Sequence, residues 1–587
     1  MTATRRAQSL SNWLMCAPAA TWLLSAGVVL FALIAAQTDR YLHDEGLLTW
    51  YFAQMPAAEP AALIFLQKSR PLLGLIYAPL ATLGLGRWGF TVVHSLVAVS
   101  ALPLLAATAR SLNIKAANLA PALLASSALW LACGPAGVSN SDAVTGLALV
   151  LYLWIVRERP LAAGLLLGAL LFARSEVALF ALGLGTFALF RARGSRRLAL
   201  AIPVVPAIYI LAGALYHHDL LWALHFPPAL PTPPPETPRF GEHGYGAGLG
   251  DTLLALLSLM PALLLLPAAR LLRGKRKSKN NSKSRTERKS RAEIHLRLFA
   301  ALALAYVAAI RGLPALGIFN FDDSPRYLLP TLPFAALALA HLCEEWQGPA
   351  LGRKLTALLA LWLGLAFLAE PGAGPTPLVA CAGLLTLLAL ARSGHPRLAS
   401  LGLVLASATA LPALEPVTRM RLADNDPDLP ALTTWLKEHP EPRSRPIVTN
   451  MPVLKTWLSR QGVSTGPLYY LLGADQDYEI ERLSNAAVGQ REALRKGLDT
   501  TFYGLPLRPP RTPTDAPAPP RLFILSADDR LDGSLPPEEW RGQLDNLATL
   551  GRIRLVVDTQ GQGDTVPPGL PPTTHPTGED AGATIDE

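Results

Sequence analysis

The feature that most constrains the fold is a series of apolar runs that continues through the first 414 residues of the chain. These runs recur roughly every 20 to 40 residues, and many approach the ~20 residues that an α-helix needs to cross a bilayer. Only 16% of the residues are charged, whereas soluble proteins carry about 25%. The pattern therefore predicts an α-helical polytopic membrane protein.

Counting the runs predicts about 13 transmembrane helices in a domain that covers residues 1–414. Several runs are shorter than a perpendicular span needs, so we expect their helices to extend into the flanking residues. The predicted spans are 22–36, 88–108, 116–133, 143–156, 161–173, 177–190, 198–215, 252–272, 296–310, 327–342, 355–368, 378–390 and 398–414.

The distribution of Lys and Arg predicts the orientation of these spans. If the N-terminus is cytoplasmic, the loops that carry Arg110, Arg157, Arg193, Arg353 and the basic run 273–295 all lie on the cytoplasmic side, as the positive-inside rule requires. We expect the basic run itself to be a disordered linker near anionic lipid. The net charge of +9 comes largely from this run. The charge is therefore explained by the cytoplasmic position of the run and gives no reason to expect a nucleic-acid partner.

The apolar run 71–85 is excluded from the count, because including it would place every later basic loop on the wrong side. We expect an interfacial or re-entrant segment there, within a first external loop that covers residues 37–87. Backbone at that depth is tolerated only against protein or a water-filled cavity. The first external loop is therefore expected to form part of a site.

The last part of the chain has ordinary globular composition. The segments 446–449, 521–525 and 552–557 read as strands, and 453–460 and 487–498 read as helices, which predicts an α/β domain over residues 415–558. The Gly/Pro/Thr-rich tail 559–587 is expected to be disordered. With 13 spans this domain is extracytoplasmic, which for a bacterial inner-membrane protein means periplasmic.

Two adjacent carboxylates follow the first apolar run, where His43, Asp44 and Glu45 open the external loop. Carboxylates close to hydrocarbon are costly and commonly functional. They could act as a general base or as metal ligands. The alternative is that Asp44 is a helix N-cap beside a solvated neighbour.

Further charged residues lie at the outer ends of predicted spans. Asp142 precedes one span, and Arg174 and Glu176 separate two short apolar runs. Each could line a site, whereas the simpler alternatives are an N-cap for Asp142 and an ion pair between Arg174 and Glu176.

Cations occur on the same outer side. Lys68 and Arg70 precede the segment 71–85, and Arg326 enters a later span. Arginine is suited to phosphate, although Lys68 and Arg70 could equally anchor to lipid headgroups. Carboxylates that accept a proton and cations that stabilise a departing phosphate are the two requirements for group transfer from a phosphate-linked lipid.

The order of these motifs resembles that of the GT-C glycosyltransferases, and most nearly the protein O-mannosyltransferase and aminoarabinose-transferase type. The resemblance rests on Asp44-Glu45, on the Lys-Ser-Arg-Pro sequence at 68–71, on Asp142, and on the segments 164–176 and 325–330. It covers roughly residues 22–342. Ser-Arg-Pro stands where the family usually has two prolines after the lysine, and the Arg-Ser-Glu segment lacks a proline often seen there.

The resemblance implies transfer of a hexose or pentose from a polyprenyl-phosphate carrier to an extracytoplasmic acceptor, which could be a protein, a lipid such as lipid A, or a glycan. It implies that Asp44 is the general base or contacts the acceptor, with Glu45 as its partner. A divalent metal ion, if one takes part, would be held by His43, Asp44 and Glu45. The implied phosphate contacts are Lys68, Arg70 and Arg326, and the implied further substrate contacts are His43, Asp142, Arg174, Glu176 and Tyr327.

Two other functions compete with this one. A transporter or flippase for lipid-linked glycans would show inverted repeats and charges at mid-membrane depth, whereas the charges here lie at outer ends. A non-catalytic scaffold for envelope assembly would tolerate replacement of the outer charged residues.

Overall fold

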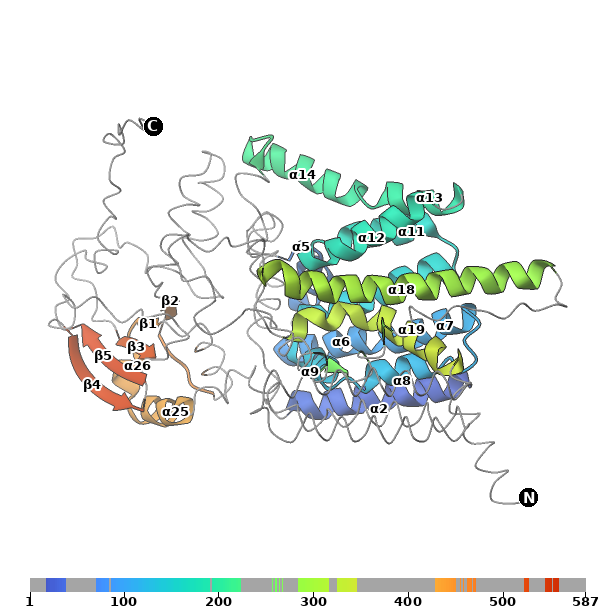
Figure 1. Ribbon diagram of the computed structural model, residues 1–587. Helices are drawn as coiled ribbons and strands as arrows, with labels where there is room; N and C mark the ends of the chain where they lie inside the picture. The colour runs from blue at the N-terminus through green and yellow to red at the C-terminus, as the bar shows by residue number, and fades with distance from the viewer. Residues whose placement is uncertain are drawn as a thin grey trace, which may run out of the picture. The chain divides into compact units, whose positions relative to one another are not determined.

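The protein is described here by a computed structural model, in which two compact units are distinguished (Figure 1). One unit comprises Met1–Gly213 with Pro228–Asn425, and the other comprises Ala214–Pro227 with Asp426–Glu587. The predicted domain boundary after residue 414 lies outside the described residues. The structure describes residues 17–37, 70–83, 86–190, 193–222, 256, 259–260, 263, 266–267, 283–315, 325–345, 428–449, 454, 458, 462–466, 468–470, 522–526, 544–551 and 553–558.

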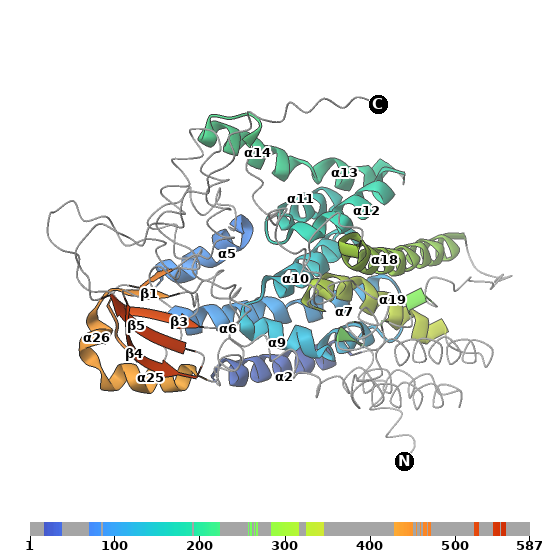
Figure 2. The same ribbon diagram turned by 60° about the vertical axis from the view of Figure 1, so that its left-hand side comes forward.

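The chain before residue 346 is helical throughout its described elements. The helices of this region lie side by side in a bundle, which Figures 1 and 2 show from two directions. They are α2 (Pro18–Gln37), α5 (Pro71–Thr82), α6 (Gly86–Val99), α7 (Ala101–Ser111), α8 (Leu119–Ala125), α9 (Ala128–Ala136), α10 (Ser139–Leu151), η2 (Tyr152–Val156), α11 (Pro160–Leu170), η3 (Ser175–Val177), α12 (Ala178–Leu189), α13 (Arg193–Ala201), α14 (Val204–His217), α18 (Lys283–Ala315), η5 (Pro325–Thr331) and α19 (Leu332–Glu345).

Five segments in the described part of the chain are long and apolar enough to cross a membrane. Each coincides with a span predicted from the sequence, so a multi-pass membrane protein is confirmed in outline. The five segments are Gly89–Ser111, Ser139–Val156, Ser195–Tyr216, Ala292–Gly312 and Arg326–Cys343.

The prediction of one continuous helix over residues 116–133 is wrong. The structure has two helices there, Leu119–Ala125 and Leu129–Ala136, which meet at 68°. Ser127 is extended, with ψ of 109°, and its side chain accepts a hydrogen bond from the backbone nitrogen of Trp130. A serine N-cap therefore starts a second helix inside an apolar run that reads as continuous.

The expectation of a disordered linker over the basic run 273–295 is also wrong in its second half. Helix α18 begins at Lys283 and continues for 33 residues to Ala315. A helix of that length is about 50 Å long, so it exceeds the ~30 Å thickness of a hydrocarbon core.

Helix α5 occupies the apolar run that was excluded from the span count. It has 12 residues and is therefore about 18 Å long, too short to cross a bilayer. This length agrees with the expected interfacial or re-entrant segment.

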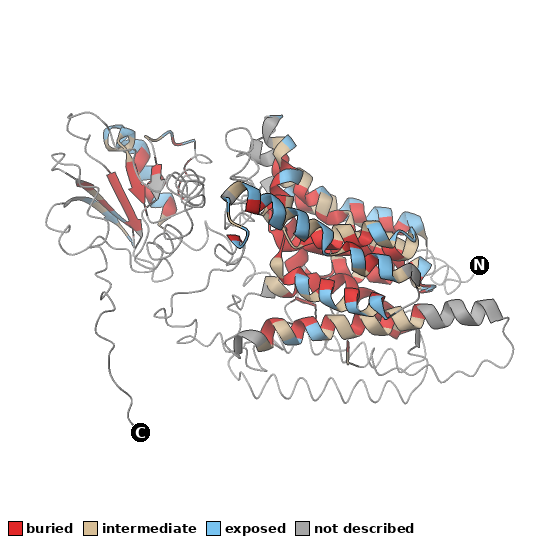
Figure 3. Cartoon of the chain, turned by 90° about the horizontal axis from the view of Figure 1, so that it is seen from above, coloured by how far each residue is buried: buried red, intermediate tan, exposed pale blue. Residues whose placement is uncertain are grey.

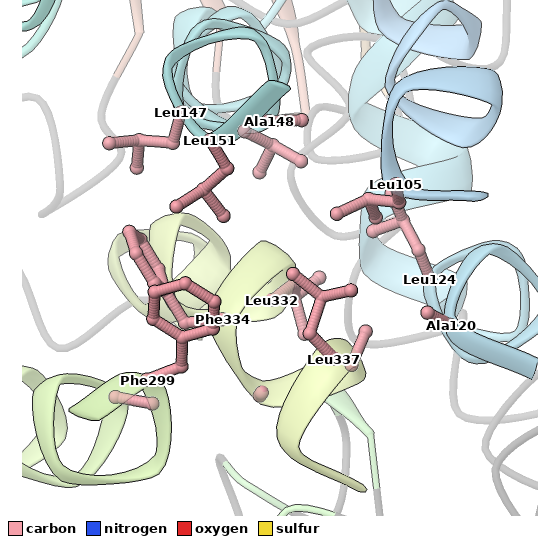
Figure 4. Packing of buried hydrophobic residues seen from close by; sticks show 14 of the residues in the cluster. Leu105, Ala120, Leu124, Leu147, Ala148, Leu151, Phe299, Leu332, Phe334 and Leu337 are labelled. Carbon is pink, nitrogen blue, oxygen red and sulfur yellow. The ribbon is translucent and has the colours of Figure 1, made fainter. Parts of the chain in front are cut away.

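The core of the helical unit is apolar and rich in aromatic rings. Leu147 and Leu151 of α10 point toward Leu332 and Phe334 of α19 (Figure 4). Phe180 of α12 stacks on Phe334, with 4.5 Å between ring centroids. The buried residues face the inside of the bundle, whereas many residues on the outer helices are exposed (Figure 3). The exposed large apolar side chains include Trp22, Leu30, Ile208, Leu211 and Leu215, as expected for contact with lipid.

Two glycines allow α11 to approach α13 and the residue that follows it closely. A Cβ atom added to Gly164 would lie 2.3 Å from the Leu198 carbonyl oxygen, and one added to Gly168 would lie 2.2 Å from the Ile202 oxygen. Small residues are the usual means of close helix packing in membranes.

The C-terminal unit contains a five-stranded mixed sheet in the order β2-β1-β3-β5-β4. β1 pairs in parallel with β2 and β3, and β5 pairs antiparallel with β3 and β4. Leu429, Leu432 and Leu436 belong to the same buried cluster as strand residues of the sheet. The elements are α25 (Leu429–Glu438), α26 (Pro440–Ser444), β1 (Ile447–Thr449), β2 (Leu468–Tyr470), β3 (Leu522–Ser526), β4 (Leu544–Leu550) and β5 (Ile553–Asp558).

The three strands predicted for this unit correspond to β1, β3 and β5. β2 and β4 were not predicted. β4 lacks β-branched residues except Thr549, and β2 has none, whereas β1, of the same length as β2, is Ile-Val-Thr. The predicted helix 487–498 and the tail 559–587 lie outside the described residues, as does the predicted helix 453–460 apart from residues 454 and 458.

Candidate functional site

A buried polar turn begins α10 and forms the centre of the candidate site. Gly137, with φ of 73°, ends α9 in the left-handed conformation, and Val138 is extended before α10 begins. Ser139, Asn140 and Ser141 are completely buried, and Asp142 is 7% exposed. Buried polar groups require partners, so the surroundings of this turn identify the site.

Asp142 is held by two other helices. Tyr77 of α5 donates its hydroxyl proton to Asp142 Oδ1 at 2.5 Å, and His94 Nε2 of α6 lies 2.8 Å from Asp142 Oδ2. The other ring nitrogen, Nδ1, lies 2.6 Å from the backbone oxygen of Gly134 in α9. One buried network thus joins α5, α6, α9 and α10.

The partners of His94 determine how many protons this network holds. A carbonyl oxygen can only accept a hydrogen bond, so His94 Nδ1 must carry a proton and donate to the Gly134 oxygen. Nε2 and Asp142 Oδ2 then need one proton between them, either as an imidazolium beside a carboxylate or as a neutral imidazole beside a carboxylic acid. In both cases the His94–Asp142 pair has no net charge.

Two arginines converge on the hydroxyl oxygen of Ser139. Arg70, the residue before α5, donates from a terminal guanidinium nitrogen to Ser139 Oγ. Arg174, from the turn before η3, donates to the same oxygen from Nη1 at 3.2 Å. The first residue of α10 therefore brings together two cations that are far apart in the sequence.

Arg174 is also paired with a buried carboxylate. Its Nε lies 2.6 Å from Glu176 Oε1, and the two side chains are 5% and 2% exposed. Asn140 donates from Nδ2 to the same Glu176 oxygen at 3.3 Å. Because the carboxylate accepts only, this contact orients the Asn140 amide and leaves Asn140 Oδ1 as a buried acceptor without a hydrogen-bond partner in the structure.

The ring of Tyr327 contributes the remaining part of the site. The guanidinium carbon of Arg174 lies 4.9 Å from the ring centroid, and that of Arg326 lies 5.3 Å from it. Tyr306 of α18 donates its hydroxyl proton to the Tyr327 backbone oxygen at 2.9 Å. Cation–π contacts of this kind hold guanidinium groups beside an aromatic face.

The structure thus links one group of the site residues predicted from the sequence. Arg70 and Arg174 meet at Ser139, Glu176 pairs with Arg174, and Arg326 shares the Tyr327 ring with Arg174. Asp142 lies one helical turn beyond Ser139 on α10.

The other predicted site residues cannot be compared with the structure. His43, Asp44, Glu45 and Lys68 lie outside the described residues. Within the part of the chain that is described, no group of three His, Cys, Asp or Glu side chains could hold a metal ion. The roles of these four residues therefore remain predictions.

Sequence reasoning did not select Tyr77, His94, Ser139 or Asn140 as site residues. Tyr77 lies inside an apolar helix, but it follows Arg70 by seven residues and so falls on the same helix face. His94 is the lone histidine of its apolar run. The sequence does show Tyr77 and His94 as polar residues inside apolar runs, but this signal does not identify Asp142 as their partner.

Comparison with known proteins relates the chain to solved structures by its fold. No protein-family model and no curated protein sequence matches it. The crystal structure of ArnT from Cupriavidus metallidurans in the apo state aligns over 93% of this chain and 100% of that chain, with a TM-score of 0.52 and 15% identity. The structure of the same ArnT bound to undecaprenyl phosphate covers 94% and 100%, with a TM-score of 0.52 and 16% identity.

The alignment shows that this chain shares the fold of ArnT, which agrees with the helical membrane fold that the order of motifs predicted. At this level of identity the likeness concerns the fold alone.

Proposed function

We propose that the chain is an integral membrane glycosyltransferase that moves a sugar from a polyprenyl-phosphate-linked donor to an acceptor on the extracytoplasmic face. The observation that carries this proposal is the convergence of Arg70 and Arg174 on Ser139, with Arg326 near the Tyr327 ring that Arg174 also contacts. The fold supports it, because one of the ArnT structures with this fold is bound to undecaprenyl phosphate.

The arginines suit the phosphate of such a donor. A guanidinium presents a planar set of donors that matches phosphate oxygens. It also stays charged at all relevant pH values, so it can stabilise the negative charge that develops on phosphate as the sugar departs. One of these arginines, Arg174, is paired with the buried carboxylate of Glu176.

In this proposal the base comes from the first external loop. Asp44 takes the proton of the acceptor group as that group attacks the anomeric carbon. Glu45 is its partner, and Lys68 is a further phosphate contact. If a divalent ion takes part, it acts at His43, Asp44 and Glu45, so EDTA is expected to slow turnover without weakening donor binding.

A transfer assay with the purified full-length chain tests the proposal. In lipid nanodiscs with an undecaprenyl-phosphate-linked sugar, we expect release of undecaprenyl phosphate, measured by liquid chromatography with mass spectrometry. Mass spectrometry of envelope lipids, glycans and proteins from a deletion strain would then identify the acceptor and distinguish hexose from pentose. A transporter would move the intact donor across the bilayer without releasing undecaprenyl phosphate, and that result would contradict the proposal.

A further inference from the structure

Two polar contacts connect α5 and the residue before it to the first turn of α10. Arg70 reaches Ser139, and Tyr77 reaches Asp142. Arg70 and Tyr77 are seven residues apart in the chain, and Ser139 and Asp142 are three residues apart on α10. Each spacing places the two residues on the same helix face. The position of Arg70 is therefore coupled to the contact that Tyr77 makes with Asp142.

Asp142 is occupied by protein groups. One carboxylate oxygen accepts from Tyr77 and the other faces His94, and the carboxylate and imidazole together carry no net charge. Tyr77 and His94 are completely buried, and Asp142 is nearly so. A buried network in which every member is satisfied rigidifies the elements that it joins.

We propose that Asp142 is a positioning residue and not a substrate contact, and that Tyr77 and His94 act with it. The three residues dock the short helix α5 on α6 and α10 and so hold the Arg70 guanidinium beside that of Arg174 at Ser139. This inference rests on the proposed function for the identity of the phosphate ligand, but the docking of α5 does not depend on it.

The sharpest test compares two substitutions of Asp142. In Asp142→Asn, Oδ1 still accepts from Tyr77, and the side-chain amide donates to Nε2 of a neutral His94. The Nδ1–H group of that His94 still donates to the Gly134 carbonyl oxygen. Asp142→Ala leaves the Tyr77 hydroxyl and His94 Nε2 buried without partners. We expect Asp142→Asn to stay within about threefold of wild type in undecaprenyl phosphate binding, and Asp142→Ala to lose roughly tenfold or more. A charged contact to the phosphate ligand would be lost in both variants, and equal losses of binding would overturn the proposal.

A double-mutant cycle separates positioning from a general effect on folding. Tyr77→Phe is expected to weaken undecaprenyl phosphate binding about fivefold to tenfold in the wild-type background and not at all in the Arg70→Ala background, because the contact of Tyr77 with Asp142 acts through Arg70. Equal losses in both backgrounds would contradict this. Thr21→Val is the matched control, since it removes a buried hydrogen bond to Asn118 at another place in the bundle, and it is expected to leave binding unchanged.

Hydrogen exchange distinguishes failure of this inference from failure of the proposed function. If wild type does not bind undecaprenyl phosphate, the proposed function falls. The amides of residues 72–78 can then be compared without ligand, and we expect them to exchange faster in Asp142→Ala than in Asp142→Asn, which should match wild type. Equal exchange in the two variants would overturn the docking role of Asp142 itself.

Discussion

Arg174 Nε lies 2.6 Å from Glu176 Oε1, and both side chains are almost completely buried. The two residues are separated by one position, and the extended backbone of Arg174 followed by the short helix η3 lets their side chains meet. Glu176 thus compensates one of the two charges that converge on Ser139, and Asn140 adds a second contact to the same carboxylate oxygen.

Removal of Glu176 is expected to destabilise the helical unit. Glu176→Ala leaves a buried guanidinium without its carboxylate, which typically costs about 3–5 kcal/mol. The measurement is the midpoint of thermal unfolding in detergent. Glu293→Ala is the control, because it breaks a partly exposed pair with Arg297 on α18 and should cost less than about 1 kcal/mol. A smaller effect for Glu176→Ala than for Glu293→Ala would show that the pair does not stabilise the fold.

Arg70→Ala is expected to weaken the binding of undecaprenyl phosphate at least tenfold, while the chain stays folded. A hydrogen bond to a charged group contributes about 1.5–3 kcal/mol, and about 1.4 kcal/mol corresponds to a factor of ten. Binding can be measured by microscale thermophoresis in detergent. Arg157→Ala, at an exposed arginine between η2 and α11, removes the same charge elsewhere and should bind as wild type does. Unchanged binding by Arg70→Ala would remove Arg70 from the phosphate site.

Asp44→Asn is expected to reduce sugar transfer by roughly 10²- to 10⁴-fold, the usual contribution of a general base. Donor binding should persist, because the substitution leaves the arginines in place. The assay is the release of undecaprenyl phosphate from its sugar-linked form. Asp219→Asn, at a residue whose carboxylate accepts from the Leu221 backbone nitrogen, is the matched control. Full activity in Asp44→Asn would exclude Asp44 as the base.

Gly168→Ala is expected to destabilise the packing of α11 against the residues that follow α13. The added methyl would lie 2.2 Å from the Ile202 carbonyl oxygen, so the backbone must shift. Overpacking of this kind costs typically about 1–3 kcal/mol. Gly27→Ala in α2 meets no atom within 4 Å and should be neutral or gain up to about 1 kcal/mol from helix propensity. Thermal unfolding of the two variants side by side gives the comparison, and equal midpoints would contradict the close approach.

The membrane class and the positions of the described spans could be predicted from the sequence, because both depend on local composition. A run of apolar residues partitions into hydrocarbon whatever its neighbours are, and Lys and Arg act on orientation loop by loop. The break at Ser127 escaped prediction, since a single serine inside an apolar run is compatible with a continuous helix. The start of α18 inside the basic run was not predicted either, because low sequence complexity and high charge favour disorder when no tertiary contact is considered.

For the candidate site, the sequence alone determined which residue types are available near the predicted membrane boundaries. Arg70, Asp142, Arg174, Glu176 and Arg326 could be selected because charge beside an apolar run is costly without a purpose. Only the tertiary structure decided their partners. Tyr77 and His94 lie 65 and 48 residues from Asp142 in the chain, and the contact exists because helix packing brings three separate apolar helices together. Spacing along the sequence reports periodicity within one helix, whereas the pairing of buried polar groups depends on which helix faces meet.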